Sequence, residues 1–132
     1  MNRIYFEPGV LVARPDVEFT EAAITPDAGE SLRNLAETGH ELVMVSGRSM
    51  DLPGDFPPMH AVPHIDEASD GSWFLTTDPE LCGPRQANLR TVLVGPGPGT
   101  HKATVQRCDV TTRDLRAAVL EILAREAMTP VA

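Results

Sequence analysis

The sequence is short of positive charge. Its 132 residues carry 11 Lys and Arg against 19 Asp and Glu, which gives a formal net charge of -8, and Lys102 is the only lysine. A surface this acidic repels phosphate backbones and anionic lipid headgroups. We therefore expect neither a nucleic acid nor a membrane as a partner.

Long hydrophobic runs and cysteines are also scarce. No apolar run approaches the roughly 18 residues needed to cross a bilayer. The N-terminus has a single Arg and only short apolar stretches, so a signal peptide is not expected. Cys82 and Cys108 are the two cysteines, and two thiols in a reducing compartment are expected to be free. These absences predict a cytoplasmic protein.

The overall composition is that of a folded domain. Apolar residues make up 42% of the chain and charged residues 23%, close to the averages for globular domains. The length fits one domain, which we expect over residues 1–128, with a frayed tail at 129–132. Prolines and glycines are dense between residues 47 and 72, which predicts loop there.

Short apolar segments alternate with helical patterns. Buried strands are expected at residues 4–6, 42–45, 73–77 and 91–94, with short strands near 60–63 and 103–105. One helix is expected from a cap at Thr25 to a stop at Gly39. A short helix is expected over 79–87, and a last one capped by Thr111 or Thr112. Strand, helix and strand in this order favour right-handed parallel crossovers, hence an α/β fold.

Polar groups follow three of these strands: Glu7-Pro8-Gly9, Ser46-Gly47-Arg48 and Thr77-Asp78. The carboxyl ends of parallel strands meet at one edge of a sheet, so these groups are expected to converge. Their order resembles the haloacid dehalogenase superfamily of phosphohydrolases, in which the first strand ends in Asp-x-Asp-Gly-Thr-Leu. The resemblance implies a three-layer, Rossmann-like parallel sheet with helices on both faces. The chain has no insertion long enough for a cap domain.

The resemblance also implies a chemistry that this sequence lacks in part. In the family, the first Asp attacks phosphorus, the second acts as acid and base, and carboxylates hold Mg²⁺. Aligning Gly9 with the motif glycine puts Phe6 at the nucleophile and Pro8 at the acid-base position. Sliding by one residue puts Glu7 at the nucleophile, where its extra methylene displaces the carboxylate by about 1 Å.

The remaining family positions match only in part. Ser46 matches the second motif, and with Gly47 and Arg48 it forms the candidate phosphate-binding group; a hydroxyl that caps the following turn is the structural alternative. Asp78 matches one metal-binding acid, and a helix N-cap is its structural alternative. Lys102 comes after the fourth region, whereas the family lysine precedes it.

Two other groups are weighed as sites. His60, His64, Asp66, Glu67 and Asp70 form the densest set of metal-ligand types, but they fit no zinc spacing, so a solvated loop is expected. The loop from Gly95 to Lys102 follows a strand, but its prolines remove N–H donors that a phosphate cradle would use. Neither group is expected to bind a cofactor.

Three functional hypotheses follow. The first is a catalytically inactive haloacid dehalogenase-like domain without a cofactor, which binds a small phosphorylated ligand, a protein partner or a second copy through a strand edge near residues 50–65. The second is an atypical phosphohydrolase that uses Glu7 and Asp78 with Mg²⁺. The third is an acidic doubly wound interaction module unrelated to phosphatases.

Overall fold

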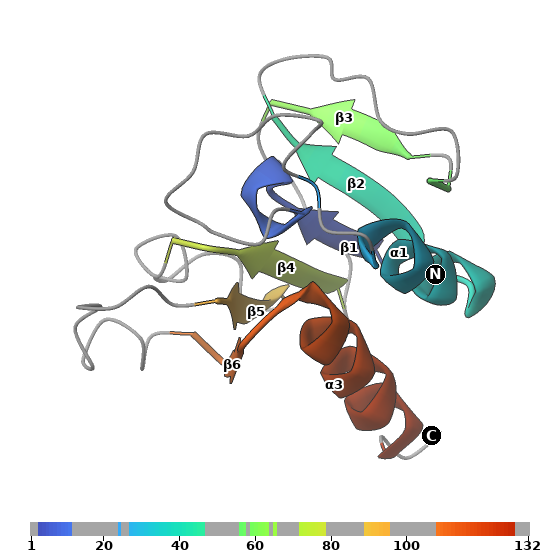
Figure 1. Ribbon diagram of the computed structural model, residues 1–132, viewed down its shortest axis with the longest axis vertical. Helices are drawn as coiled ribbons and strands as arrows, with labels where there is room; N and C mark the ends of the chain where they lie inside the picture. Colours follow the sequence, from blue (N-terminus) through green and yellow to red (C-terminus); the bar gives the residue numbers. More distant parts are fainter. Residues whose placement is uncertain are drawn as a thin grey trace.

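The computed structural model describes residues 3–11, 24, 27–46, 56–57, 59–63, 65, 72–78, 89–95 and 108–128. Its elements in chain order are β1 (Arg3–Phe6), η1 (Pro8–Leu11), α1 (Ala28–Glu37), β2 (Glu41–Val45), β3 (His60–Val62), β4 (Ser72–Thr76), β5 (Leu89–Val94), β6 (Val110–Thr112) and α3 (Leu115–Met128) (Figure 1).

The six strands form one parallel sheet in the order β3-β2-β1-β4-β5-β6. β1 lies near the centre, with Ile4 in register with Leu42 of β2 on one side and with Trp73 of β4 on the other. This Rossmann-like α/β arrangement confirms the predicted fold class. No cap domain is evident in the described part of the chain.

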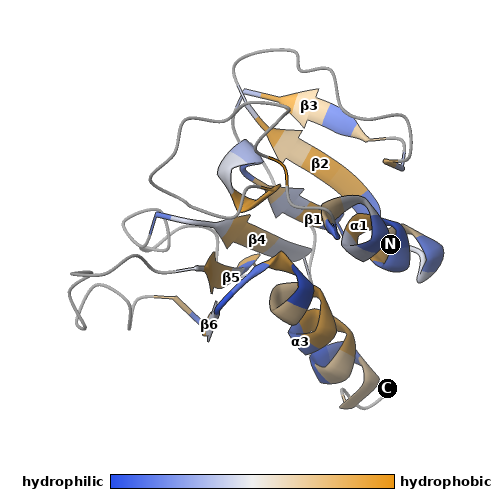
Figure 2. Ribbon diagram, viewed as in Figure 1, coloured by the Kyte–Doolittle hydropathy of each residue, from blue (hydrophilic) through white to orange (hydrophobic). Residues whose placement is uncertain are grey.

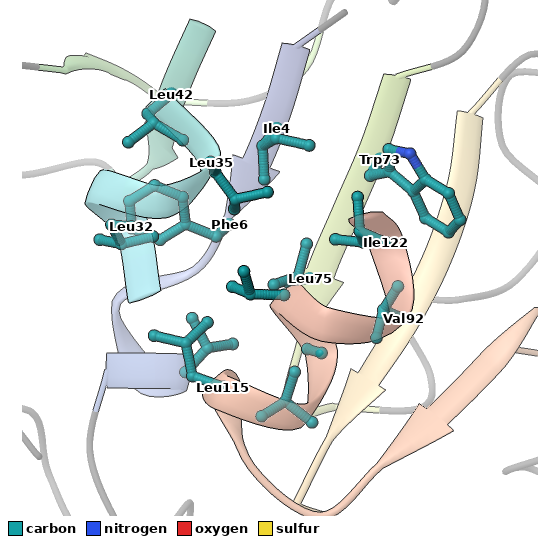
Figure 3. Packing of buried hydrophobic residues seen from close by; sticks show 14 of the residues in the cluster. Ile4, Phe6, Leu32, Leu35, Leu42, Trp73, Leu75, Val92, Leu115 and Ile122 are labelled. Carbon is teal, nitrogen blue, oxygen red and sulfur yellow. The ribbon is translucent and has the colours of Figure 1, made fainter. Parts of the chain in front are cut away.

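One face of the sheet carries the main core. Because side chains alternate along a strand, Ile4 and Phe6 of β1 face the same way as Trp73 and Leu75 of β4. The helices α1 and α3 contact one another and cover this face, placing Leu32, Leu35, Leu115, Val119 and Ile122 on it (Figures 1 and 3). Figure 2 shows the hydrophobic colouring concentrated in the central strands.

The opposite face carries a smaller apolar cluster. Tyr5, Val43, Phe74 and Leu89 are buried there. Both described helices lie on the other face. A short helix was expected from the sequence over 79–87. That segment lies outside the described residues.

The boundaries of the two helices correct two sequence predictions. Asp27, not Thr25, is the N-cap of α1, and it makes no side-chain capping hydrogen bond. The last helix is capped by Asp114, whose Oδ1 accepts the Ala117 N–H at 2.8 Å. Thr111 and Thr112 lie in β6 instead, because the final edge strand is at Val110–Thr112 rather than near residues 103–105.

The end of α1 confirms the predicted stop at Gly39. Gly39 has a φ of 93°, a conformation that suits glycine because it has no Cβ. Its N–H donates to the Ala36 carbonyl at 3.1 Å, and the His40 N–H donates to the Leu35 carbonyl at 3.2 Å. This pair of bonds is a Schellman motif, and it turns the chain directly into β2.

The other strand predictions have mixed outcomes. The short strand near residues 60–63 is present as β3. The residues 103–105 lie outside the described part, and the final edge strand is formed by Val110–Thr112. The apolar stretch after β1 continues as a 3-10 turn, η1, because Pro8 and Gly9 interrupt the strand pattern.

Cys108 corrects the expectation of free thiols. It is disulfide-bonded, and Cys82, which lies outside the described residues, is the only other cysteine in the sequence. Cys108 packs against Leu93 of β5, immediately before β6. Among the described helices, none is long and apolar enough to cross a membrane.

Candidate site at the β1–β4 switch point

The strand order has one place where the chain reverses its direction across the sheet. From β1 it moves outward through β2 to β3, then returns to β4 on the other side of β1. In open parallel sheets, ligands bind beyond the carboxyl ends of the strands at such a switch point. Glu7 directly follows β1, and Asp78 comes two residues after β4. Two residues predicted from the sequence therefore lie at this edge.

Thr76 connects these two acidic residues. Its hydroxyl donates to the Glu7 carboxylate, and its Oγ1 accepts the Asp78 N–H at 3.0 Å. Thr76 is completely buried at the end of β4. Its side chain is thus a fixed connection between the ends of β1 and β4. This role could not be predicted from the sequence, because a threonine at that position fits a strand equally well.

The backbone around Glu7 is fixed as well. The Glu7 N–H donates to the Leu75 carbonyl at 3.1 Å, and its own carbonyl accepts the Val10 N–H at 3.1 Å. A Cβ on Gly9 would lie 3.3 Å from the Thr77 side-chain oxygen. Glycine therefore allows the η1 turn to lie close to the end of β4, while the buried Val10 anchors that turn in the core.

The two alternative nucleophile positions are placed very differently. Phe6 is 0% exposed and belongs to the core cluster beneath the helices (Figure 3). A carboxylate at that position would lie in the core. Glu7 is half-buried at the edge of the sheet, and Asp78 is exposed. Of the two alignments, only the one that uses Glu7 places a carboxylate at the carboxyl edge.

Ser46 reaches the same edge from β2, the other neighbour of β1. It directly follows β2, and its N–H donates to the Val62 carbonyl at 2.8 Å, which joins it to the end of β3. Gly47 and Arg48, predicted with it as a phosphate-binding group, lie outside the described residues. Lys102 also lies outside them.

The candidate metal ligands remain few. Within the described ranges, no three His, Cys, Asp or Glu side chains gather closely enough to hold a metal ion. His60 begins β3 and pairs with Glu41 at 3.6 Å, away from Glu7. His64, Asp66, Glu67 and Asp70 lie outside the described part. Among the described residues, Glu7 and Asp78 are the carboxylates beside the β1–β4 switch point.

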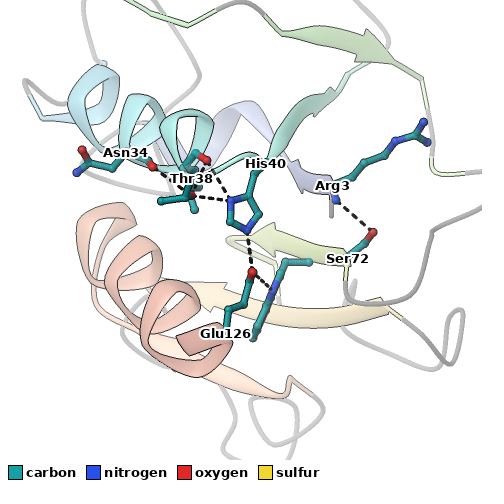
Figure 4. Close-up of polar contacts among 8 residues, drawn as sticks. Arg3, Asn34, Thr38, His40, Ser72 and Glu126 are labelled. Atoms are coloured by element: carbon teal, nitrogen blue, oxygen red, sulfur yellow. Dashed lines mark hydrogen bonds and ion pairs between the residues drawn. The ribbon is translucent and has the colours of Figure 1, made fainter. Parts of the chain in front are cut away.

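A second polar cluster lies at the opposite, amino edge of the sheet (Figure 4). His40 Nε2 contacts the Glu126 carboxylate at 2.8 Å, and Trp73 Nε1 donates to the same carboxylate at 3.2 Å. The Thr38 hydroxyl oxygen lies 2.8 Å from His40 Nδ1. The cluster thus joins the end of α1, the start of β4 and the end of α3. Its members are far apart in the sequence, which is why sequence patterns did not reveal it.

Arg90 completes this second cluster. Its guanidinium lies 3.8 Å from the centroid of the Trp73 ring, a cation-π distance. Burial lowers the pKa of the Arg90 guanidinium below its usual value, and the Glu126 carboxylate opposes that shift. The arrangement ties helices to strands at the edge away from Glu7, so we interpret it as structural.

Comparison with known proteins supports the fold and nothing finer. No protein-family model matches the chain, and no curated protein matches it either. A chain solved by crystallography has a similar structure, with a TM-score of 0.54 and 16% sequence identity, over 98% of both chains. At 16% identity this similarity shows a shared fold alone, and the similar region covers almost the whole of both chains.

Proposed function

We propose that this chain is a haloacid dehalogenase-like domain that does not catalyse phosphoryl transfer and acts by binding a partner at the β1–β4 edge. The observation that supports this most is the state of Glu7. The carboxylate in the nucleophile position accepts a hydrogen bond from the fully buried Thr76 hydroxyl.

A nucleophile must reach phosphorus in line and at close range. Glu7 is longer than the aspartate of the family, and its carboxylate is held against the end of β4 by Thr76. The acid-base position next to it has no carboxylate, since Pro8 and Gly9 follow Glu7. In the described residues, neither a well-placed nucleophile nor a second carboxylate at the acid-base position is found, which supports the proposal.

The charges at this edge favour a basic partner over a phosphorylated one. Among the described residues that directly follow the six strands, Glu7, Asp78 and Asp114 are acidic, and the one basic side chain, Arg113, is paired with Asp114 at 3.7 Å. Phosphate recognition in proteins relies on cationic side chains and exposed backbone N–H groups. The net charge of the whole chain, -8, is negative as well and would also repel a phosphorylated ligand. An arginine or lysine side chain of a protein partner suits this edge better than a small phosphorylated ligand does.

The second candidate is an atypical phosphohydrolase that uses Glu7 and Asp78 with Mg²⁺. It is favoured by the position of both residues at the switch point, where the Thr76 hydroxyl contacts the Glu7 carboxylate and the backbone N–H of Asp78. The third candidate, an acidic doubly wound module of other ancestry, would use the same sheet edge. It differs from the first in descent rather than in the contacts expected.

Turnover separates the first two candidates. The purified protein is assayed on an aryl phosphate with and without Mg²⁺, beside Glu7→Ala and Asp78→Ala. We expect no turnover above a buffer control in any of the three proteins. Mg²⁺-dependent turnover in the wild type that is lost in both variants would overturn the proposal and establish the phosphohydrolase.

Binding is tested by amide chemical shifts. An arginine-containing peptide is expected to shift the amide signals of residues 7, 9–11 and 76–78, and the shifts should shrink in a Glu7→Gln/Asp78→Asn variant. Inorganic phosphate is the matched probe of opposite charge and should leave these signals in place. Shifts with phosphate but not with the peptide would contradict the assignment of a basic partner.

The disulfide bears on where this binding occurs. Disulfides persist in oxidising compartments and are rare in the cytosol. The bonded state of Cys108 therefore argues against the cytoplasmic location expected from the sequence. We propose an oxidising compartment, which thiol titration of protein taken directly from its native source would test: two titratable thiols per chain would contradict it.

A further inference from the structure

The outward side of α3 is apolar. Leu120 is 57% exposed and Met128 is 82% exposed, and they are the large hydrophobic side chains that the described residues leave in solvent. Ala124 and Ala127 are exposed as well. Residues three, four, seven and eight apart lie on one side of a helix. We call these four residues, Leu120, Ala124, Ala127 and Met128, the outer α3 face.

The neighbouring helix shows the contrast. α1 packs beside α3 on the same sheet, but it exposes Glu30, Asn34 and Glu37 to solvent, and Figure 2 colours it mostly hydrophilic. A helix that covers a sheet normally has one apolar stripe and one polar face. On its inner side, α3 already buries the apolar residues Leu115, Ala118, Val119 and Ile122 against the sheet. The outer α3 face is therefore a second apolar side that packing against the sheet does not require.

We propose that the outer α3 face binds a second copy of this chain, with the two α3 helices antiparallel about a two-fold axis. Glu121 and Arg125 flank the face, paired at 2.8 Å in one helix and partly exposed. In the antiparallel arrangement Glu121 lies opposite Arg125 of the second copy, and the symmetry makes this contact twice. A parallel arrangement would instead put the two Glu121–Arg125 pairs on opposite sides of the contact, where they would not meet.

The same register is complementary in size. It places Leu120 beside Ala124 and Ala127 of the second copy, and Met128 beside Ala117 of the second copy. Each large side chain thus meets small ones, which allows two helices to approach closely and interdigitate.

Charge also favours this face for self-association. Two copies that each carry a net charge of -8 repel one another. The outward side of α3 has the exposed Arg116 one turn before Leu120 and no acidic residue among the outer α3 face, whereas the exposed side of α1 carries Glu30 and Glu37. Two copies therefore meet with less repulsion at α3 than at α1.

The size of the contact sets its strength. A helix of 14 residues is about 21 Å long. A contact confined to one side of it buries less than the roughly 1,600 Å² of a standard interface. We therefore expect a weak dimer, with a dissociation constant of about 1 µM or higher.

Analytical ultracentrifugation tests the proposal. The full chain is measured from about 1 µM to about 1 mM, beside Leu120→Glu and the control Asn34→Glu, which adds the same charge to the exposed side of α1. We expect the wild type and Asn34→Glu to dimerise alike. Leu120→Glu should raise the dissociation constant by at least about tenfold, because the change occurs twice in the interface.

A charge swap tests the register. Glu121→Arg should weaken the dimer, and Glu121→Arg/Arg125→Glu should restore it, with circular dichroism confirming that every variant is folded. A wild type that stays monomeric at the highest concentration would overturn the proposal. A dimer that Leu120→Glu leaves unchanged would also overturn it and would point to another surface, such as the strand edge near residues 50–65.

Discussion

Replacing Glu126 by alanine should remove the centre of the cluster at the amino edge of the sheet. The Glu126 carboxylate accepts from Trp73 Nε1 at 3.2 Å and contacts His40 Nε2 at 2.8 Å. The His40 side chain is only 5% exposed, and Trp73 is 1% exposed. Glu126→Ala thus leaves two buried N–H groups without this acceptor.

The expected cost follows from these contacts. An unsatisfied buried donor costs about 1–3 kcal/mol, which for two donors gives an upper figure of about 6 kcal/mol. The Glu126 side chain is 22% exposed, so water can replace part of what is lost. We therefore expect the free energy of unfolding to fall by about 2–3 kcal/mol. That corresponds to about 6–12 °C in Tm for a domain of this size.

Urea denaturation measures this loss, followed by the fluorescence of Trp73, the only tryptophan in the chain. The midpoint should fall while the slope m stays constant. Glu121→Ala on the same helix is the matched control. Its partner Arg125 is half-exposed, so this control should change stability by no more than about 0.5 kcal/mol. Equal effects of the two substitutions would refute the reasoning that the buried cluster supports the fold.

Two further predictions concern the core and the last helix. Phe6→Asp, which would place an aspartate at the nucleophile position in one alignment with the haloacid dehalogenase motif that the sequence resembles, should lower stability by more than about 3 kcal/mol and give no phosphatase activity, because Phe6 lies in the core. A folded, active variant in unfolding and phosphatase assays would show that residue 6 reaches the sheet edge. Asp114→Ala should cost about 1 kcal/mol in urea unfolding because it removes a capping bond. Asp27→Ala removes no such bond and should cost less, and equal losses would contradict the capping assignment.

The strands were predictable because their signal is local. The apolar runs at residues 4–6, 42–45 and 91–94 mark β1, β2 and β5 as buried, and the structure places all three in the sheet. The end of α1 at Gly39 was also predictable, since its positive φ is a requirement of one residue. The helix starts were harder to predict. Each helix start had several capping residues nearby. Thr112 belongs to β6, so Asp114 caps α3.

Half of the candidate site could be predicted in the same way. Glu7, Ser46 and Asp78 were placed at one edge from strand order alone, because the carboxyl ends of parallel strands share an edge. The hydrogen bonds that these side chains make were not predictable. Whether Glu7 is held by a hydroxyl depends on Thr76, which is 69 residues away in the chain and lies beside Glu7 only because β1 pairs with β4.

Residue types at short spacing were enough to predict the class of the fold and the positions of the buried strands, and the sequence has no Asp-x-Asp motif after its first strand. Only the tertiary structure decided that Phe6 lies in the core, that Thr76 holds Glu7, and that His40, Trp73 and Glu126 meet. It also decided that α3 has an apolar side facing solvent. These facts depend on pairing between distant segments, which local patterns do not encode.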